Sequence, residues 1–291
     1  MAAHDDPAKS VKDMAGQTVL ITGGNSGIGF CTAHALLRRG ARVILGCRSE
    51  ERASQAVAQL KELLPDAAVD FELVDLSSLR SVQDFADEIL RLEDRLDVLI
   101  LNAGAMAPAC RQRTREGYEV CFCSNYLGHF HLVNKLLPLL EKSAPSRIVV
   151  VSSAAHKMAG NVLDDLQVEK NYGKWRAYSQ SKMCQVVHCA ELARRLKGRG
   201  VTANCLHPGV VGSEFFRGVW YSGLVRWLAR TPEKGAETTI YLATAPAVKD
   251  VSGAYFVDCR QATPHRLATN EAIGAKLWEL SEDLVRRTLH S

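Results

Sequence analysis

Short apolar runs alternate along this chain with longer stretches in which apolar positions recur every three or four residues. The short runs are rich in Val, Ile and Leu, and such runs are typical of parallel strands that are buried on both faces. We therefore expect strands at Thr18–Thr22, Val43–Gly46, Val69–Val74, Val98–Leu101, Arg147–Ser152, Val201–Leu206 and Ala254–Val257. The longer stretches predict helices near 27–39, 50–63, 78–92, 116–140, 176–197, 233–244 and 271–288.

This alternation predicts an α/β fold, in which one doubly wound parallel sheet of the Rossmann type carries helices on both faces. We expect a polar N-terminal tail over residues 1–16 and a single domain over 17–291 that ends in a helix. Ligands of such sheets bind beyond the carboxyl ends of the strands. Candidate site residues should therefore follow the strands in the sequence.

The composition narrows the class of protein. Of the 291 residues, 47% are hydrophobic and 23% are charged, which is typical of a globular domain. The net charge of +4 is too small to indicate a nucleic-acid partner. No run of about 18 apolar residues predicts a membrane span. The nine cysteines are scattered without zinc-site spacing, so we expect reduced thiols, no metal and a cytoplasmic location.

A glycine-rich segment, Thr22–Gly29, lies between the first predicted strand and the first predicted helix. Glycines permit a tight turn and let the backbone approach a pyrophosphate, while the helix N-terminus offers free N–H groups to the phosphates. The context therefore favours dinucleotide binding over a purely structural turn. The expected contacts are Gly23, Asn25, Ser26, Gly27, Ile28 and Gly29.

The end of the second predicted strand indicates which dinucleotide is bound. An acidic residue there is usual in proteins that bind NAD, whereas an arginine accommodates the 2′-phosphate of NADP. This chain carries no acid at the strand end, and Arg48 follows at once. A guanidinium matches phosphate in a forked geometry, so we favour NADP(H). The alternative is a solvated surface arginine beside Glu50 or Glu51.

Tyr178 and Lys182 are four residues apart in a predicted helix and so share one face. A tyrosine has a pKa of about 10, and a neighbouring ammonium is expected to lower it. The phenol could then exchange a proton with a hydroxyl or carbonyl group. The alternative is a solvated helix face.

Together these motifs resemble the short-chain dehydrogenase/reductase family over residues 17–260. The matching segments are the Thr22–Gly29 turn, Asp75-Leu76, Asn102-Ala103-Gly104, Asn125 in SNYLGHF, the Ser152-Ser153 pair, Tyr178-Ser179-Gln180-Ser181-Lys182 and His207-Pro208-Gly209-Val210-Val211. The resemblance implies cofactor contacts at Asp75, Leu76, Asn102, Ala103, Gly104, Tyr178, Lys182, Pro208, Gly209, Val211 and Ser213.

The resemblance also implies a catalytic tetrad of Asn125, Ser153, Tyr178 and Lys182. Tyr178 would be the general acid or base. Lys182 would lower the pKa of Tyr178 and bind the nicotinamide ribose. Ser153 would hydrogen-bond the substrate oxygen, and Asn125 would position a relay water. His129, His156 and His207 fall near this site, and we interpret them as packing or hydrogen-bonded residues, with the mouth of the pocket as an alternative place for His156.

Several details are similar to the retinol dehydrogenase branch, among them Gly46-Cys47-Arg48-Ser49, Asn125–Phe130, Ser152–His156 and the interval of 25 between Ser153 and Tyr178. This branch implies NADP(H) and a lipophilic alcohol or carbonyl substrate, such as a retinoid, sterol, isoprenoid or lipid aldehyde. Many of its members begin with a hydrophobic anchor, whereas this chain begins with polar residues. The alternatives are a broad detoxifying carbonyl reductase and a cofactor-bound regulatory protein with little catalysis.

The segment near 213–230 is the expected substrate lid. If it is helical, one face carries Phe216, Trp220, Leu224, Trp227 and Leu228. Such a face could cover an apolar substrate or rest peripherally on a membrane surface. It could equally pack on the core or at a subunit interface. The family resemblance further implies a homo-oligomer formed through the helices near 116–140 and 176–197.

Overall fold

The computed structural model describes residues 13–210 and 230–290 and contains an eight-stranded sheet with the order β3-β2-β1-β4-β5-β6-β7-β8. The strands are β1 (Thr18–Thr22), β2 (Arg42–Cys47), β3 (Val69–Leu73), β4 (Val98–Leu101), β5 (Ser146–Val151), β6 (Val201–His207), β7 (Tyr255–Val257) and β8 (Arg260–Ala262). Every neighbouring pair is parallel except β7 and β8. The central strands are buried along their length, which explains their uninterrupted apolar sequences.

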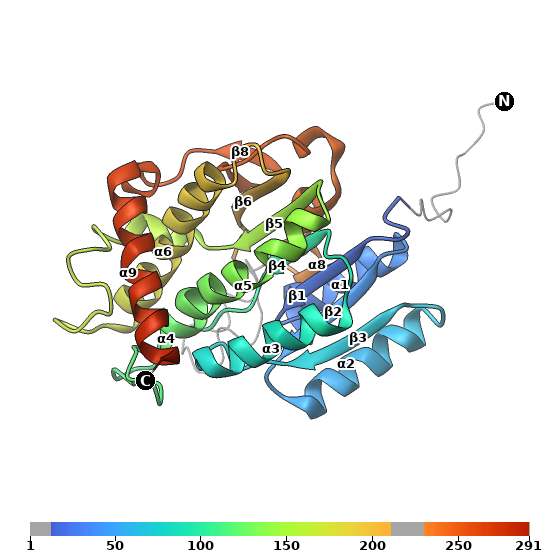
Figure 1. Cartoon of the computed structure of the whole chain (residues 1–291), viewed down its shortest axis with the longest axis horizontal. Helices are drawn as coiled ribbons and strands as arrows, with labels where there is room; N and C mark the ends of the chain where they lie inside the picture. Colours follow the sequence, from blue (N-terminus) through green and yellow to red (C-terminus); the bar gives the residue numbers. More distant parts are fainter. Residues whose placement is uncertain (1–12, 211–229, 291) are drawn as a thin grey trace.

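Two layers of helices cover the sheet (Figure 1). One layer contains α1 (Gly27–Arg38), α2 (Glu50–Leu63) and α8 (Pro232–Thr244), and the other contains α3 (Leu79–Leu92), α5 (Gly128–Lys142), α6 (Lys174–Arg195) and α9 (Glu271–Leu289). Shorter pieces are α4 (Val120–Phe122), the π-helical turn η1 (Cys123–Leu127) and the 3₁₀ helices η2 (Ala154–Met158), η4 (Pro246–Val248) and η5 (Arg266–Thr269). Each layer encloses its own apolar core against the sheet.

The doubly wound parallel sheet confirms the expected fold class, and the seven expected strands end within one residue of their predicted limits. Three details differ. The helix expected from 116 starts at Val120 and contains the π-helical turn. The antiparallel strand β8 was not expected. The expected tail over 1–16 includes Met14, which is buried in the core beside α1 and β2.

The strand order reverses between β1 and β4, because the chain builds β2 and β3 on one side of β1 and β4 to β6 on the other. At such a switch point the loops after neighbouring strands diverge and leave a crevice for a ligand. The Thr22–Gly29 turn follows β1, and Asn102-Ala103-Gly104 follows β4. The fold therefore brings two of the predicted cofactor segments to the same place.

Helix α9 packs across α6 and α5 by aromatic contacts. The Trp278 ring meets the Phe130 ring edge-on with their centroids 5.0 Å apart, and it lies 5.5 Å from the His188 ring. The Arg195 guanidinium carbon lies 4.2 Å from the centroid of the Trp278 ring, within range of a cation–π interaction. All residues of α6 from Ala177 to Cys189 are buried. This stretch is thus covered on every side within one chain.

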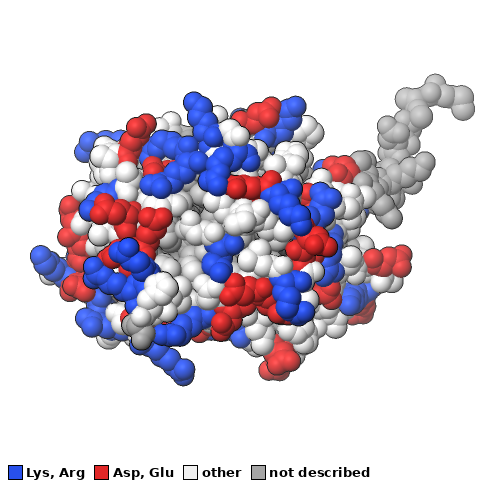
Figure 2. Space-filling model, viewed as in Figure 1, with Lys and Arg blue, Asp and Glu red and all other residues white. Residues whose placement is uncertain are grey.

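Charges of both signs are interspersed over the face shown in Figure 2. Elsewhere in the described chain an ion pair joins Arg42 of β2 to Asp70 of β3, and both side chains are exposed. Exposed pairs of this kind contribute little stability each. Within the described ranges, none of the helices combines the length and the apolar character needed to cross a bilayer.

Candidate active site

Tyr178 and Lys182 lie one turn apart in the buried part of α6, with 5% and 3% of their surfaces exposed. The Lys182 ammonium lies 5.8 Å from the centroid of the Tyr178 ring and donates a hydrogen bond to the Val151 carbonyl oxygen at 3.1 Å. The carboxyl end of β5 therefore fixes the lysine, and the helix fixes the tyrosine beside it. The alternative interpretation as a solvated helix face is wrong.

Burial governs the proton affinities of this pair. Burial raises the pKa of Tyr178 to about 12, although a hydrogen bond with Ser153 acts in the opposite direction. Burial lowers the pKa of Lys182 to about 8. This direction is opposite to the lowering that the sequence led us to expect, because loss of hydration of the phenolate is the largest contribution. At neutral pH Tyr178 is protonated and can act as a proton donor.

Ser153 and Ser152, at the end of β5, have different roles. The Ser152 hydroxyl is buried and donates to the Lys182 carbonyl oxygen at 3.0 Å, so it joins β5 to α6. Ser153 is half-buried and begins η2, where its side-chain oxygen accepts a hydrogen bond from the Ala155 amide at 3.2 Å. Of these two serines, Ser153 is the one that forms a hydrogen bond with the Tyr178 side chain. The structure thus brings the second serine to the site, as expected.

Asn125 lies in the π-helical turn η1 and is completely buried. Its side-chain oxygen accepts from the Ala105 amide at 2.9 Å, and its side-chain nitrogen donates to the Ala105 carbonyl oxygen and to the Ser181 hydroxyl, both at 3.0 Å. These bonds hold the chain after β4 against α6. As a result, a Cβ atom on Gly104 would lie only 3.2 Å from the Lys182 nitrogen. A relay water at Asn125 stays a prediction.

Asn102 holds the glycine turn in place. Its side-chain nitrogen donates to the carbonyl oxygens of Thr22, at 2.9 Å, and of Gly23, at 3.1 Å. Gly23 has a φ of +68°, which favours glycine. A Cβ atom on Gly29 would lie 2.3 Å from the Gly23 carbonyl oxygen, so helix and turn approach too closely for a side chain. At Gly23 and Gly29, therefore, only glycine fits, and the turn is held in this shape without a ligand.

The N-terminus of α1 suits an anion. Ser26 precedes the helix and makes no side-chain capping bond, and the first turn carries no acidic residue. Its N–H groups and positive dipole end are therefore available for phosphate. Together with the close approach of Gly29 to the turn, this arrangement fits a dinucleotide. Asn25, Gly27 and Ile28 lie at the same turn and are half-buried.

Arg48 is exposed immediately after β2, and no ion pair engages it within the described part of the chain. This exposure agrees with the alternative of a solvated surface arginine as well as with a phosphate contact, so the role of Arg48 stays a prediction. Asp75 follows β3, and its carboxylate accepts hydrogen bonds from the Ser77 amide and hydroxyl at 2.9 and 2.7 Å. Leu76 is buried beside it. Its carbonyl oxygen lies close to Gly128 at the start of α5, since a Cβ atom on this glycine would be only 2.4 Å away.

Pro208 and Gly209 follow β6, and Gly209 has a φ of +86°. The Arg230 side chain packs directly against this glycine: a Cβ atom on Gly209 would be 2.6 Å from the arginine Cδ. The Arg230 amide donates to the Val210 carbonyl oxygen at 2.8 Å, and its guanidinium pairs with Asp258. Val211, Ser213 and the expected lid, including Phe215–Leu228, lie outside the described residues.

The histidines near the site are structural where described. His129 is buried, with its Nε2 atom 2.9 Å from the Thr22 hydroxyl and its Nδ1 atom 3.0 Å from the Asn125 carbonyl oxygen. His156 is fully buried rather than at a pocket mouth, since its Nδ1 atom bonds the Ser153 carbonyl oxygen at 2.7 Å and its ring packs on Tyr255. His207 is half-buried at the end of β6.

A small apolar cluster surrounds Tyr178, separate from the two main cores. Its buried members are Ala107, Cys121, Val168, Ala177 and Tyr178, and Met106, Ala155 and Tyr172 pack against it. We call this set the Tyr178 cluster. The sequence analysis missed these neighbours, because they come from four segments that only the tertiary structure brings together. The spacing of three between the aromatic residues Tyr172, Trp175 and Tyr178 was the one local signal.

Comparisons with known proteins agree with this geometry. A family model described as short chain dehydrogenase matches residues 17–221. Retinol dehydrogenase 14 of Homo sapiens is 46% identical over 293 residues, which cover 94% of this chain and 87% of that protein. The crystal structure of an uncharacterized protein from Mycobacterium paratuberculosis superposes with a TM-score of 0.77 at 33% identity and covers 94% of each chain.

A second solved structure, the RhlG/NADP active-site complex of Pseudomonas aeruginosa, has a TM-score of 0.70 at 26% identity and covers 85% of this chain and 96% of that one. The family model spans well over half of the chain, and the glycine turn, the Asn102 segment and the Tyr178–Lys182 pair occupy the sheet edge that the motifs predicted. The chain therefore belongs to the short-chain dehydrogenase family of oxidoreductases and, within it, to the retinol dehydrogenase-like branch.

Proposed function

We propose that this protein is an NADP(H)-dependent oxidoreductase that interconverts a lipophilic alcohol and its aldehyde or ketone. The observation that carries the proposal is the Tyr178–Lys182 pair, which is buried at the carboxyl end of β5 within an apolar cluster. Apolar surroundings favour a substrate whose reacting carbon carries a hydrocarbon body, such as a retinoid, sterol, isoprenoid or lipid carbonyl. The name of the relative retinol dehydrogenase 14 supports this class.

The cofactor would be held by residues from several strand ends. The Gly23–Gly29 turn and the N-terminus of α1 would bind the pyrophosphate, and the exposed Arg48 would bind the 2′-phosphate. Asp75 and Leu76 would contact the adenine side, while Lys182, Asn102, Ala103, Gly104, Pro208 and Gly209 would lie toward the nicotinamide side. When bound, the nicotinamide supplies or accepts the hydride.

Tyr178 would supply the proton. Because burial raises its pKa to about 12, the phenol stays protonated at neutral pH and can donate to the oxygen of a carbonyl that is being reduced. Ser153, already hydrogen-bonded to Tyr178, would hold that oxygen. Lys182, whose pKa is lowered to about 8, would stabilise the phenolate left behind when it is charged. The protonated phenol is the form that would donate the proton when a carbonyl is reduced.

The test measures NADPH consumption by the purified protein with decanal, with NADH in parallel. We expect turnover with NADPH, and a loss of about 100- to 10,000-fold in kcat for Tyr178→Phe, the usual contribution of general acid catalysis. The matched control is Tyr172→Phe, because that nearby phenol donates to the Pro108 carbonyl oxygen at 2.9 Å and has no role in the reaction. Equal activity of Tyr178→Phe and wild type would refute the proposed role.

A further inference from the structure

Trp175 lies at the exposed edge of the Tyr178 cluster. Its ring meets the Tyr178 ring nearly edge-on, with centroids 6.3 Å apart and an angle of 80° between the planes. The two residues are three apart on α6 and so share one helix face. Half of the surface of Trp175, 50%, remains exposed to solvent. A large apolar ring thus stands open directly beside the reacting phenol.

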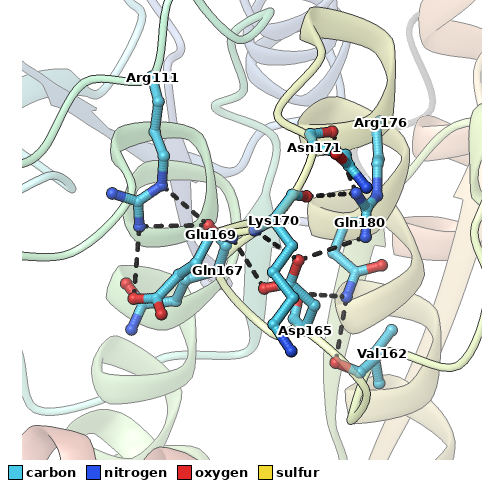
Figure 3. A network of polar contacts seen from close by, with 9 residues as sticks. All are labelled: Arg111, Val162, Asp165, Gln167, Glu169, Lys170, Asn171, Arg176 and Gln180. Atoms are coloured by element: carbon cyan, nitrogen blue, oxygen red, sulfur yellow. Dashed lines mark hydrogen bonds and ion pairs between the residues drawn. The ribbon is translucent and has the colours of Figure 1, made fainter.

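The segment before Trp175 is held firmly to α6 by polar contacts (Figure 3). The Arg176 guanidinium donates to the Asn171 carbonyl oxygen at 3.0 Å and to the Asp165 carboxylate at 3.3 Å. The Gln180 side chain donates to the carbonyl oxygens of Val162 and Asp165 at 3.0 and 3.2 Å. These contacts fix the first turn of α6 and, with it, the place of Trp175.

Val168 is a buried member of the same cluster, and its backbone conformation is energetically unfavourable. Its φ is +48°, which is unfavourable for a β-branched residue and persists only where surrounding contacts impose it. The preceding residue, Gln167, is held in place: its carbonyl oxygen accepts from Arg111 at 3.3 Å (Figure 3). Its side-chain oxygen accepts from the Glu119 amide at 3.0 Å. Val168 is closed to solvent, with 2% of its surface exposed, whereas Trp175, which contacts Tyr178 of the same cluster, is half exposed.

We propose that Trp175 is a specificity-determining residue that binds the hydrocarbon body of the substrate. This inference rests on the proposed function and narrows it to substrates with an apolar chain or ring next to the carbonyl group. With the reacting oxygen at Tyr178 and Ser153, such a body lies against the indole and removes its exposed surface from water. A small carbonyl compound has no atoms to place there and gains nothing from the indole.

The kinetic test compares decanal with butane-2,3-dione at saturating NADPH. Trp175→Ala is expected to lower kcat/KM for decanal by roughly 30- to 250-fold, mainly through KM, as loss of about 100 Å² of apolar contact predicts. For butane-2,3-dione the change should stay within about twofold. Trp175→Phe should restore most of the decanal activity, because it keeps a flat apolar ring. Equal losses for both carbonyls, or an unchanged KM for decanal, would overturn the proposal.

The control is Met158→Ala, since Met158 at the end of η2 is a more exposed apolar side chain, at 70%, without a ring contact to Tyr178. It should leave both substrates unaffected. Binding of decanal to Tyr178→Phe with NADPH, measured by calorimetry with and without Trp175→Ala, separates this proposal from the proposed function. If decanal binding depends on Trp175 but the wild type shows no turnover, the role of Trp175 in binding is supported and the proposed reaction is refuted. If the wild type turns decanal over and Trp175→Ala does not change this, the proposed reaction is supported and the role of Trp175 is refuted.

Discussion

Replacing His188 with Phe should make the protein less sensitive to acid. His188 is buried on α6 between the rings of Tyr126, Phe130 and Trp278, and its Nε2 atom has no hydrogen-bond partner within the described residues. Burial lowers its pKa from 6.5 to about 3, and the charge of Arg195 adds to the effect. The folded protein therefore keeps this ring neutral, while the unfolded chain takes up a proton below pH 6.5.

The sign and size of the effect follow from this difference. Above pH 6.5, His188 is neutral in both states and does not reduce the free energy of unfolding. As the pH falls from 6.5 toward 3, the unfolded chain binds a proton at this residue and the folded protein does not, so the free energy of unfolding decreases. Between pH 7.5 and pH 5.5 the loss due to His188 alone is about 1.4 kcal/mol. Phe cannot titrate and fits an aromatic site. The difference in unfolding free energy between His188→Phe and wild type should thus grow by about 1.4 kcal/mol over this range.

Urea unfolding followed by circular dichroism at 222 nm, at pH 7.5 and 5.5, measures both free energies. Any steric cost of the larger ring is independent of pH and cancels in the comparison. His290→Phe is the matched control, because it removes a histidine that is exposed after α9 rather than buried. A difference between His188→Phe and wild type that is the same at both pH values would refute the reasoning.

Two further predictions concern the cofactor. Gly29→Ala should weaken NADPH binding at least about tenfold in fluorescence titration, because its Cβ atom would meet the Gly23 carbonyl oxygen at 2.3 Å, whereas Gly160→Ala, with open space at that position, should leave the dissociation constant unchanged. Arg48→Glu should raise the Kd for NADPH by about 10- to 100-fold, the worth of a charge-assisted phosphate contact, and hardly alter that for NADH. Equal effects on the two nucleotides would count against a 2′-phosphate contact.

The sequence predicted most of the sheet because its strands are buried on both faces and therefore read as unbroken apolar runs. β8 escaped prediction since it has three residues, two of them exposed, and follows a turn in which Asp258 and Cys259 have positive φ values. The π-helical turn around Asn125 also left no periodic signal. Its position depends on contacts with Ala105 and Ser181, which are remote in sequence.

The sequence named the residues of the candidate site, whose roles stay predictions, but it did not indicate how burial acts on their pKa values. Spacing placed Lys182 beside Tyr178, and this suggested a lowered tyrosine pKa. The extent of burial, which reverses the direction, depends on the whole tertiary structure. Likewise, Trp175 has an ordinary helical position in the sequence. Its closeness to Tyr178 at a solvent-exposed edge, and the strained Val168 behind it, could only come from the folded chain.

The packing of α9 bears on how copies of this protein could associate. The helices near 176–197 were expected to meet a second copy, yet the Ala177–Cys189 stretch of α6 is already enclosed by its own chain. Trp278 and the Tyr126–Ser281 hydroxyl contact at 2.7 Å fasten α9 over this region. A second subunit that contacted the part of α6 beneath Trp278 would have to displace α9. The C-terminal helix thus acts, within one polypeptide, as a built-in cover for this part of α6, and the expected homo-oligomer stays a prediction.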